Sequence, residues 1–447
     1  MQEVKSLYMS KINYAQVDEH GNIILPPRLA RDLGISPGDE IRVEPNGHGL
    51  CLRPSITALK RVYVEITNKC NLNCSTCMRN VWDVKYAGMT AETFNRILSS
   101  LEGLPQKPEL FFGGYGEPLS HPRILEMVEQ AKKAGHFVSL ITNGILLTEQ
   151  VTRRLIELRL DKLWVSMDGA SPECYADVRL GDALPVVVEN LTRLRMQKYQ
   201  VFGFSAWAGV PKLGIAFVAM KRNIHDLGEV IKLGTRLGAV EFSVSNVLAH
   251  NAELLDENLY MNSMSLAPST QLSPLVHVPL MDINQQTIGA LSDVLKGMNR
   301  LDFFGGILNQ NTDQCPFVER GSISVRQDGK VSPCLPLLYT HEHFLDDRKR
   351  TSKEYFVGDL YENELLDIWN HASYLELRKR LQGFDFSPCA FCNSCFQKLQ
   401  VHRRNAPLLI RPQSWQNSPV PIQIRLAASQ IRLWTRRWTQ CPLCFPS

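Results

Sequence analysis

Long apolar segments and a secretion signal are missing from this chain of 447 residues. No apolar run approaches the ~18 residues that a membrane-spanning helix needs, so we expect no membrane insertion. Residues 1–11 lack the basic and then apolar pattern of a signal peptide, which predicts a reducing, cytoplasmic location. In that compartment the 12 cysteines are better interpreted as metal ligands than as disulfides.

Acidic residues are missing from the last part of the chain. Residues 397–447 contain eight Lys or Arg and no Asp or Glu, whereas the whole chain has 49 basic and 45 acidic residues. A disordered tail attracted to anions is one interpretation, but three tryptophans and many aliphatic residues argue against it. We therefore interpret residues 397–447 as a basic tail that follows a shift of the reading frame near Cys395.

Residues 1–58 have the pattern of a small β-rich module. Short strand-like runs alternate with turns, and the segments 21–26 and 33–40 resemble the AbrB-like swapped-hairpin family of dimeric DNA-binding modules. The resemblance implies a homodimer through this module. Residues 9–54 carry five basic and six acidic side chains, which makes nucleic-acid binding a poor prediction, because phosphate neutralisation supplies most non-specific affinity.

Residues 59–305 alternate between strand and helix patterns. The strand-like runs lack strict alternation, which indicates burial on both faces and hence a parallel sheet. We predict an α/β fold with a partial (βα)6 TIM-type barrel, whose functional residues lie at the carboxyl ends of the strands. The expected strands are 61–67, 109–112, 137–142, 162–167, 213–220 and 240–246, and the expected helices are 91–101, 123–134, 149–158, 185–197 and 224–237.

Three closely spaced cysteines, Cys70, Cys74 and Cys77, follow the first barrel strand. Three thiolates can ligate three irons of one cubane and leave the fourth iron open for a substrate or cofactor. Zinc would normally take a fourth Cys or His nearby, and His48 and His121 are not at zinc-finger spacing. The triplet therefore favours an iron–sulfur cluster with an open iron.

The triplet in this position resembles the radical S-adenosylmethionine (SAM) superfamily. The resemblance implies a [4Fe–4S] cluster that binds SAM, and one-electron cleavage of SAM to a 5′-deoxyadenosyl radical that abstracts hydrogen from a substrate. The residue before the third cysteine is usually aromatic in this superfamily and packs on adenine. Here it is Thr76, so the adenine must be held by other residues.

Polar residues follow the other predicted strands. The run Gly113-Gly114-Tyr115-Gly116-Glu117-Pro118 resembles the superfamily's Gly-Gly-Glu-Pro run with Tyr115 in place of its first glycine, which implies that Gly116 and Glu117 bind the SAM amino group. Asn143, Ser166 and Asp168 stand at the third and fourth strand ends and could hydrogen-bond the ribose or the methionine carboxylate. Local turn capping is the alternative for these three residues.

A second set of cysteines lies in residues 306–396, which we predict to be a cysteine-rich cluster domain. Its members are Cys315, Cys334, Cys389, Cys392 and Cys395. Their spacing resembles the SPASM extension of radical SAM enzymes, which implies one or two auxiliary iron–sulfur clusters. Zinc is the chemical alternative. Cys389, Cys392 and Cys395 have the spacing Cys-x2-Cys-x2-Cys, which is shorter than the corresponding group of the SPASM pattern. The five thiols of this region suffice for one closed cluster.

The combination of modules most resembles the radical SAM maturases of tungsten-cofactor oxidoreductases. It implies a partner, a tungsten-dependent aldehyde oxidoreductase or its metal–pterin cofactor, and an electron donor such as ferredoxin or flavodoxin. A SPASM enzyme acting on a peptide substrate is the alternative within enzymes. A DNA-binding regulator with a redox-sensing cluster is the alternative of another class.

Overall fold

The computed structural model describes residues 55–383 with gaps at 105, 180–182, 207–208, 346–347 and much of 260–314, and it describes parts of residues 14–53. The chain forms two compact units, Met1–Ala58 and Leu59–Ser447. Cys389, Cys392, Cys395 and the basic tail lie outside the described residues.

The described part of the first unit consists of two short antiparallel hairpins. Strand β1 (Gln16–Val17) pairs with β2 (Ile23–Ile24), and β3 (Arg42–Asn46) pairs with β4 (Gly49–Arg53). The carboxylate of Asp18 accepts hydrogen bonds from the backbone of His20 and Asn22 and so closes the first turn. The apolar residues Val17, Ile23 and Ile24 of the β1–β2 hairpin remain more than half exposed.

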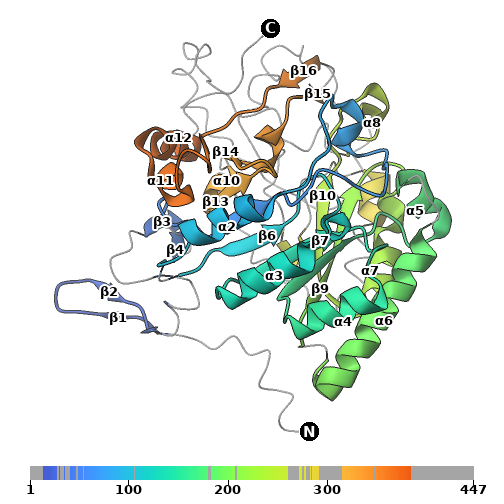
Figure 1. Ribbon diagram of the computed structural model, residues 1–447, viewed down its shortest axis with the longest axis horizontal. Coiled ribbons are helices and arrows are strands. Elements are labelled where there is room, and N and C mark those ends of the chain that lie inside the picture. Colours follow the sequence, from blue (N-terminus) through green and yellow to red (C-terminus); the bar gives the residue numbers. More distant parts are fainter. Residues whose placement is uncertain are drawn as a thin grey trace, which may run out of the picture. The chain divides into compact units, whose positions relative to one another are not determined.

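Six parallel strands form the centre of the second unit (Figure 1). Consecutive strands are hydrogen-bonded neighbours throughout, which is the order that right-handed βα units produce. The predicted partial barrel is confirmed. The strands are β5 (Arg61–Val64), β6 (Glu109–Phe112), β7 (Val138–Thr142), β8 (Lys162–Ser166), β9 (Lys212–Ala219) and β10 (Ala239–Asn246).

Helices follow the strands and pack on the outer side of the curved sheet (Figure 1). Phe94 of the first helix, for example, packs against Phe112 with ring centroids 5.7 Å apart. Thr90 and Thr148 cap helix N-termini by accepting from the backbone of Thr93 and Val151. The helices are α2 (Ala91–Ser100), α3 (Ile124–Lys133), α4 (Glu149–Glu157), α5 (Pro172–Arg179), α6 (Leu184–Phe202), α7 (Leu227–Arg236) and α8 (Ala252–Asp256).

The barrel does not close on itself. At one edge, β5 pairs in parallel with β13 (Ser322–Val325), which continues into β14 (Lys330–Ser332) and β17 (Gly358–Asp359). At the other edge, β10 pairs with β12 (Val276–His277) and this with β11 (Gln271–Ser273). The C-terminal region is therefore hydrogen-bonded to the strand that leads into the cysteine triplet.

The rest of the C-terminal region surrounds this edge of the sheet. It comprises α10 (Pro316–Glu319), a 3-10 turn η7 (Leu335–Leu338), the hairpin β15 (His341–Leu345) and β16 (Arg348–Ser352), α11 (Leu365–Asn370) and α12 (Ala372–Gly383). The pattern at 364–381 suggests one amphipathic helix, but the structure has two. His371 has extended backbone angles, φ −60° and ψ 133°, and so ends the first helix.

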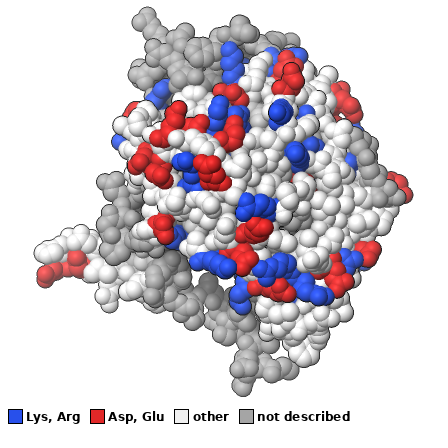
Figure 2. Space-filling model, viewed as in Figure 1, with Lys and Arg blue, Asp and Glu red and all other residues white. Residues whose placement is uncertain are grey.

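Charges of both signs are interspersed over the face seen in Figure 2. Several form pairs one helical turn apart, such as Arg153 with Glu149 and Arg96 with Glu92. No helix in the described part of the chain is long and apolar enough to cross a membrane.

Candidate SAM and iron–sulfur site

The three cysteines of the triplet lie in the loop between β5 and the 3-10 turn η2 (Met78–Val81), at the carboxyl end of the barrel. We call residues 65–77 the Cys loop. All three thiols are free, with Cys74 buried and Cys70 and Cys77 half-buried. The backbone N–H of Cys77 donates to the carbonyl of Cys74 at 3.0 Å, and the side-chain amide of Asn80 donates to the same carbonyl at 2.9 Å.

Each sulfur of the triplet has a nitrogen donor close to it. The backbone N–H of Leu72 lies 3.4 Å from the Cys70 sulfur, Arg79 Nε lies 3.3 Å from the Cys77 sulfur, and Arg179 Nη1 lies 3.5 Å from the Cys74 sulfur. Burial raises the pKa of Cys70 and Cys74, and the nearby guanidinium groups oppose that rise. The net pKa of both thiols stays raised, and the nitrogen donors are the groups that would hold the thiolate, the form that binds iron.

The donor set fits a cluster better than a single metal ion. Within the described ranges, no three His, Cys, Asp or Glu side chains converge closely enough to hold one ion. Zinc needs several ligands around a single centre, whereas a cubane takes one thiolate on each of its irons. The Cys loop thus suits the [4Fe–4S] cluster expected from its sequence.

Arg179 was not among the residues singled out from the sequence. It ends α5 and forms a 2.5 Å ion pair with Asp168, whose carboxylate also accepts from the backbone N–H of Val218 at 2.7 Å. Burial lowers the pKa of Arg179, but the charges of Asp168 and Cys74 raise it by more, so the guanidinium stays charged. Asp168 therefore positions the arginine beside the Cys74 sulfur.

Gly116 brings the glycine-rich loop against the Cys loop. A Cβ atom on this residue would lie 2.1 Å from the carbonyl oxygen of Thr67 and 2.6 Å from that of Lys69. The next backbone N–H, that of Glu117, donates to the Lys69 carbonyl at 2.7 Å. Only glycine permits this approach, so Gly116 supports the Cys loop through its backbone.

The Glu117 carboxylate is buried and points toward the end of β7. It accepts hydrogen bonds from Thr142 Oγ1 and the Asn143 N–H, both at 2.7 Å, and from the Leu119 N–H at 3.0 Å. Burial raises the pKa of Glu117, and these hydrogen bonds oppose the rise. A carboxylate offers about four acceptor positions, so one remains for a further donor such as an ammonium group.

Of the other strand-end residues, Asn143 lies beside the triplet. Asn143 Nδ2 donates to Asn71 Oδ1 at 2.7 Å and lies 3.8 Å from the Cys70 sulfur. Ser166 ends β8 half-buried, and no side-chain hydrogen bond joins it to the other candidates in the described part of the chain. The roles of Gly116, Glu117, Asn143, Ser166 and Asp168 toward SAM stay predictions.

Cys315 and Cys334 flank the β13–β14 hairpin, and both are half-buried. Burial raises the pKa of the Tyr374 phenol on α12. The charges of Cys334 and Cys315 raise this pKa further, because both thiols lie within electrostatic reach of the phenol. The two cysteines are thus brought to one region. Whether Cys389, Cys392 and Cys395 join them concerns residues outside the described part.

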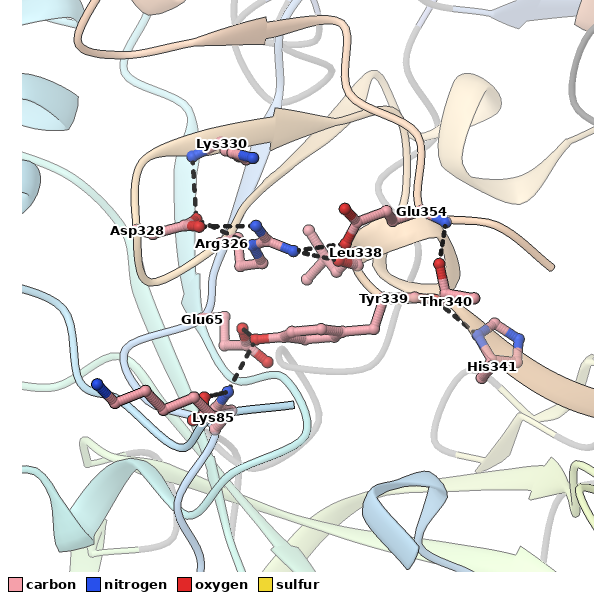
Figure 3. A network of polar contacts seen from close by, with 11 residues as sticks. Glu65, Lys85, Arg326, Asp328, Lys330, Leu338, Tyr339, Thr340, His341 and Glu354 are labelled. Carbon is pink, nitrogen blue, oxygen red and sulfur yellow. Dashed lines mark hydrogen bonds and ion pairs between the residues drawn. The ribbon is translucent and has the colours of Figure 1, made fainter. Parts of the chain in front are cut away.

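A buried polar network connects the C-terminal region to the start of the Cys loop (Figure 3). Tyr339 Oη donates to Glu65 Oε2 at 2.5 Å and accepts from Asn68 Nδ2 at 3.2 Å. Arg326 lies over the Tyr339 ring at 5.2 Å and pairs with Asp328 at 2.7 Å. Burial raises the pKa of Glu65 to about 7, against the hydrogen bond from Tyr339. Sequence patterns could not reveal this network, because its members lie far apart along the chain.

Comparison with known families matches both cysteine regions. Residues 64–213 match the model of the radical SAM superfamily, and residues 315–396 match that of the iron–sulfur cluster-binding domain called SPASM. The first match contains Cys70, Cys74 and Cys77, and the second contains Cys315 and Cys334. The AbrB-like resemblance of the first unit stays a prediction.

Three relatives illustrate how far the similarity extends. A tungsten-containing aldehyde ferredoxin oxidoreductase cofactor-modifying protein of Pyrococcus furiosus is 27% identical over 390 residues, which cover 86% of this chain and 98% of that protein. A PqqA peptide cyclase of Streptomyces rochei is 27% identical over 194 residues, which cover 43% of this chain and only 50% of that enzyme. A second PqqA peptide cyclase, from Granulibacter bethesdensis, is 23% identical over 335 residues, which cover 74% of this chain and 78% of that enzyme.

The fold also has a counterpart among solved structures. The structure of anSMEcpe with bound AdoMet superimposes on this chain with a TM-score of 0.51 at 16% identity. The superposition covers 76% of this chain and 85% of that one. At this identity the likeness concerns the fold alone. The two family matches, over residues 64–213 and 315–396, identify the chain as a radical SAM superfamily enzyme that carries a SPASM domain after its barrel.

Proposed function

We propose that this enzyme cleaves SAM reductively and uses the resulting radical to mature a tungsten-dependent aldehyde oxidoreductase, by modifying either its metal–pterin cofactor or the protein itself. The observation that carries the proposal is the alignment with the Pyrococcus protein over 98% of that protein's length. A similarity confined to the barrel would indicate only radical chemistry in general.

The residues of the site have separate tasks in this proposal. Cys70, Cys74 and Cys77 hold the cluster, which supplies the electron that splits the sulfonium of SAM. Glu117 accepts the ammonium of SAM at its remaining acceptor position, and Asn143 lies beside the same end of the loop. Arg79 and Arg179 stabilise the anionic thiolates through charge-assisted hydrogen bonds.

The second group of cysteines has a supporting role. We propose that Cys315 and Cys334, with Cys389, Cys392 and Cys395, hold one or two auxiliary iron–sulfur clusters. The SPASM match to residues 315–396 includes all five positions. An electron donor such as ferredoxin or flavodoxin would reduce the site in the cytoplasm, and the first unit would mediate a homodimer or partner docking.

The partner dependence of SAM cleavage tests the proposal. Reconstituted protein is incubated anaerobically with dithionite and SAM, with or without a tungsten-dependent aldehyde oxidoreductase purified from cells that lack this enzyme. We expect 5′-deoxyadenosine to rise with the oxidoreductase and a mass change in its extracted cofactor or in its polypeptide. SAM cleavage that the oxidoreductase neither stimulates nor couples to a mass change would contradict the assignment.

Peptide modification is the second candidate. It is supported by the similarity to PqqA peptide cyclases, which covers 50% of the Streptomyces enzyme and 78% of the Granulibacter enzyme, against 98% of the Pyrococcus protein. A short precursor peptide that stimulates deoxyadenosine formation, with the oxidoreductase inactive in the same assay, would favour it.

A further inference from the structure

Three aromatic rings from three segments meet beside the Cys loop. Trp82 follows Cys77, Tyr115 lies in the glycine-rich loop after β6, and Tyr339 follows Cys334. The Trp82 and Tyr339 rings stack with centroids 4.2 Å apart and planes inclined by 30°. The Tyr115 ring stands nearly perpendicular to that of Trp82, at 83° and 4.7 Å. Tyr339 is buried, whereas Trp82 and Tyr115 are partly exposed.

The polar network of Figure 3 holds Tyr339, and Glu65 of that network also faces the backbone N–H of Tyr115. The Tyr339 hydroxyl is hydrogen-bonded to Glu65 and Asn68, and the Arg326 guanidinium lies over the Tyr339 ring. The backbone N–H of Tyr115 points to Glu65 Oε1 at 3.4 Å, and its hydroxyl donates to the carbonyl of Leu335 at 3.3 Å. Rings held in this way lose little conformational entropy when a ligand packs on them.

We propose that Trp82 and Tyr115 form an aromatic wall that binds a planar heteroaromatic ring of the substrate. This inference rests on the proposed function in the form in which the enzyme modifies the metal–pterin cofactor of the oxidoreductase. Flat heterocycles stack on exposed aromatic side chains with about 1–3 kcal/mol per ring. The wall lies at the carboxyl end of the barrel strands, where such enzymes bind their substrates.

The Tyr115 hydroxyl and the Glu117 carboxylate point to different parts of the site. The Tyr115 hydroxyl reaches toward Leu335, next to Cys334, while Glu117, two residues later, points to Thr142 and Asn143. Tyr115 also replaces a glycine of the superfamily's usual run, so a ring fills space that a glycine would leave open. The adenine of SAM has the same stacking chemistry as a pterin, and the experiment must separate the two.

Binding of two probes to cluster-loaded, full-length protein separates these ligands. Dissociation constants for 6-hydroxymethylpterin and for SAM are measured by calorimetry in the wild type, Trp82→Leu and Tyr115→Leu. We expect the pterin constant to rise roughly 5- to 150-fold in each variant with the SAM constant unchanged. Trp82→Phe, which keeps a stacking ring, should restore most of the affinity. Tyr361→Leu is the matched control, because Tyr361 is 46% exposed and packs on Arg96.

Each other outcome overturns the inference. Weaker SAM binding with unchanged pterin binding assigns the wall to adenine. Equal pterin binding by all variants places the pterin elsewhere. If the wild type binds no pterin but the oxidoreductase still stimulates SAM cleavage, the wall is wrong while the proposed function stands. If neither is observed, both fail. Unchanged cluster absorbance in the variants shows that they fold.

Discussion

Glu117 is the residue whose surroundings define its expected task most closely. Its three hydrogen bonds hold the carboxylate at the junction of the glycine-rich loop and β7. The loss of a charge-assisted hydrogen bond to the SAM ammonium costs about 1.5–3 kcal/mol, or roughly 10- to 150-fold in affinity. We expect that weakening in Glu117→Ala, and also in Glu117→Gln, which keeps an acceptor oxygen but removes the charge.

Calorimetric titration of SAM into both Glu117 variants checks this expectation. Glu126→Gln is the control, because Glu126 is exposed on α3 and pairs with Arg123. An unchanged dissociation constant in Glu117→Gln would reject the assignment of the ammonium to this carboxylate.

Glu65 predicts a pH dependence of stability. Burial raises its pKa from 4.5 to about 7, so the folded state holds the proton more tightly than the unfolded state. The protonated Glu65 therefore stabilises the folded state fully below pH 4.5, and this stabilisation is lost as the pH rises through about 7. At 1.36 kcal/mol per pKa unit, the loss in the free energy of unfolding is on the order of 3 kcal/mol.

Thermal unfolding of the wild type and Glu65→Gln measures this effect. We expect the melting temperature of the wild type, relative to that of Glu65→Gln, to fall between about pH 5 and pH 8. A difference that stays constant over this range would show that Glu65 titrates normally. The other groups facing Glu65, namely Tyr339, Arg326 and Asp328, are the same in both proteins.

Single residues were predictable where the chemistry is local. The spacing of Cys70, Cys74 and Cys77 identifies a cluster loop by itself, because the three thiolates are close in the chain. Arg79 also follows the triplet by two residues, but nothing in its neighbourhood marks it as a partner of the Cys77 sulfur. Arg179 lies 105 residues from Cys74, and only the packing of α5 brings them together.

At the scale of elements, the contact between the glycine-rich loop and the Cys loop predicts a strong effect of one methyl group. In Gly116→Ala the new Cβ would overlap the Thr67 carbonyl oxygen at 2.1 Å, and backbone cannot move aside as a flexible side chain can. We expect the Cys loop to shift and the iron content per chain after reconstitution to fall. Gly289→Ala is the control, since nothing lies within 4 Å of its added Cβ.

Full iron content and normal SAM cleavage in Gly116→Ala would contradict this packing. The same experiment distinguishes a structural from a purely ligand-binding role of the glycine, because a ligand-binding role would leave the iron content unchanged.

The barrel strands were predictable because apolar runs bounded by turns mark buried strands. All six predicted strands coincide with β5 to β10 to within a few residues. Helix α5 was not predicted, because the sequence pattern indicates only one helix, at 185–197, between the strands β8 and β9. The structure has two helices there, α5 and α6. The pairing of β13 with β5 was also missed, since a strand's neighbour across a sheet edge depends on tertiary packing alone.

At the scale of the whole molecule, the first unit predicts self-association. Val17, Ile23 and Ile24 are 51% to 68% exposed on a two-stranded hairpin, and such a hairpin is marginal without a partner surface. We expect a dimer by light scattering, and a monomer for Ile24→Glu. Val186→Glu, at a valine 43% exposed on α6, should leave the dimer intact.

DNA binding is the competing outcome for this unit. Binding to duplex DNA at physiological salt that is abolished by deleting residues 1–58 would show that the near-neutral charge of the module misled the interpretation. A monomeric wild type would remove the dimer prediction as well.

The central claim is that the Cys loop holds the cluster that cleaves SAM, and Cys74→Ala tests it most directly. Anaerobically reconstituted wild type, Cys74→Ala and Cys174→Ala are compared for iron content and for 5′-deoxyadenosine formed with dithionite and SAM. Cys174 lies on α5 beside His225 and outside the triplet, so its variant serves as the control. We predict that Cys74→Ala loses about four irons per chain and all deoxyadenosine, whereas Cys174→Ala keeps both. Deoxyadenosine formation by Cys74→Ala at the wild-type rate would contradict the account.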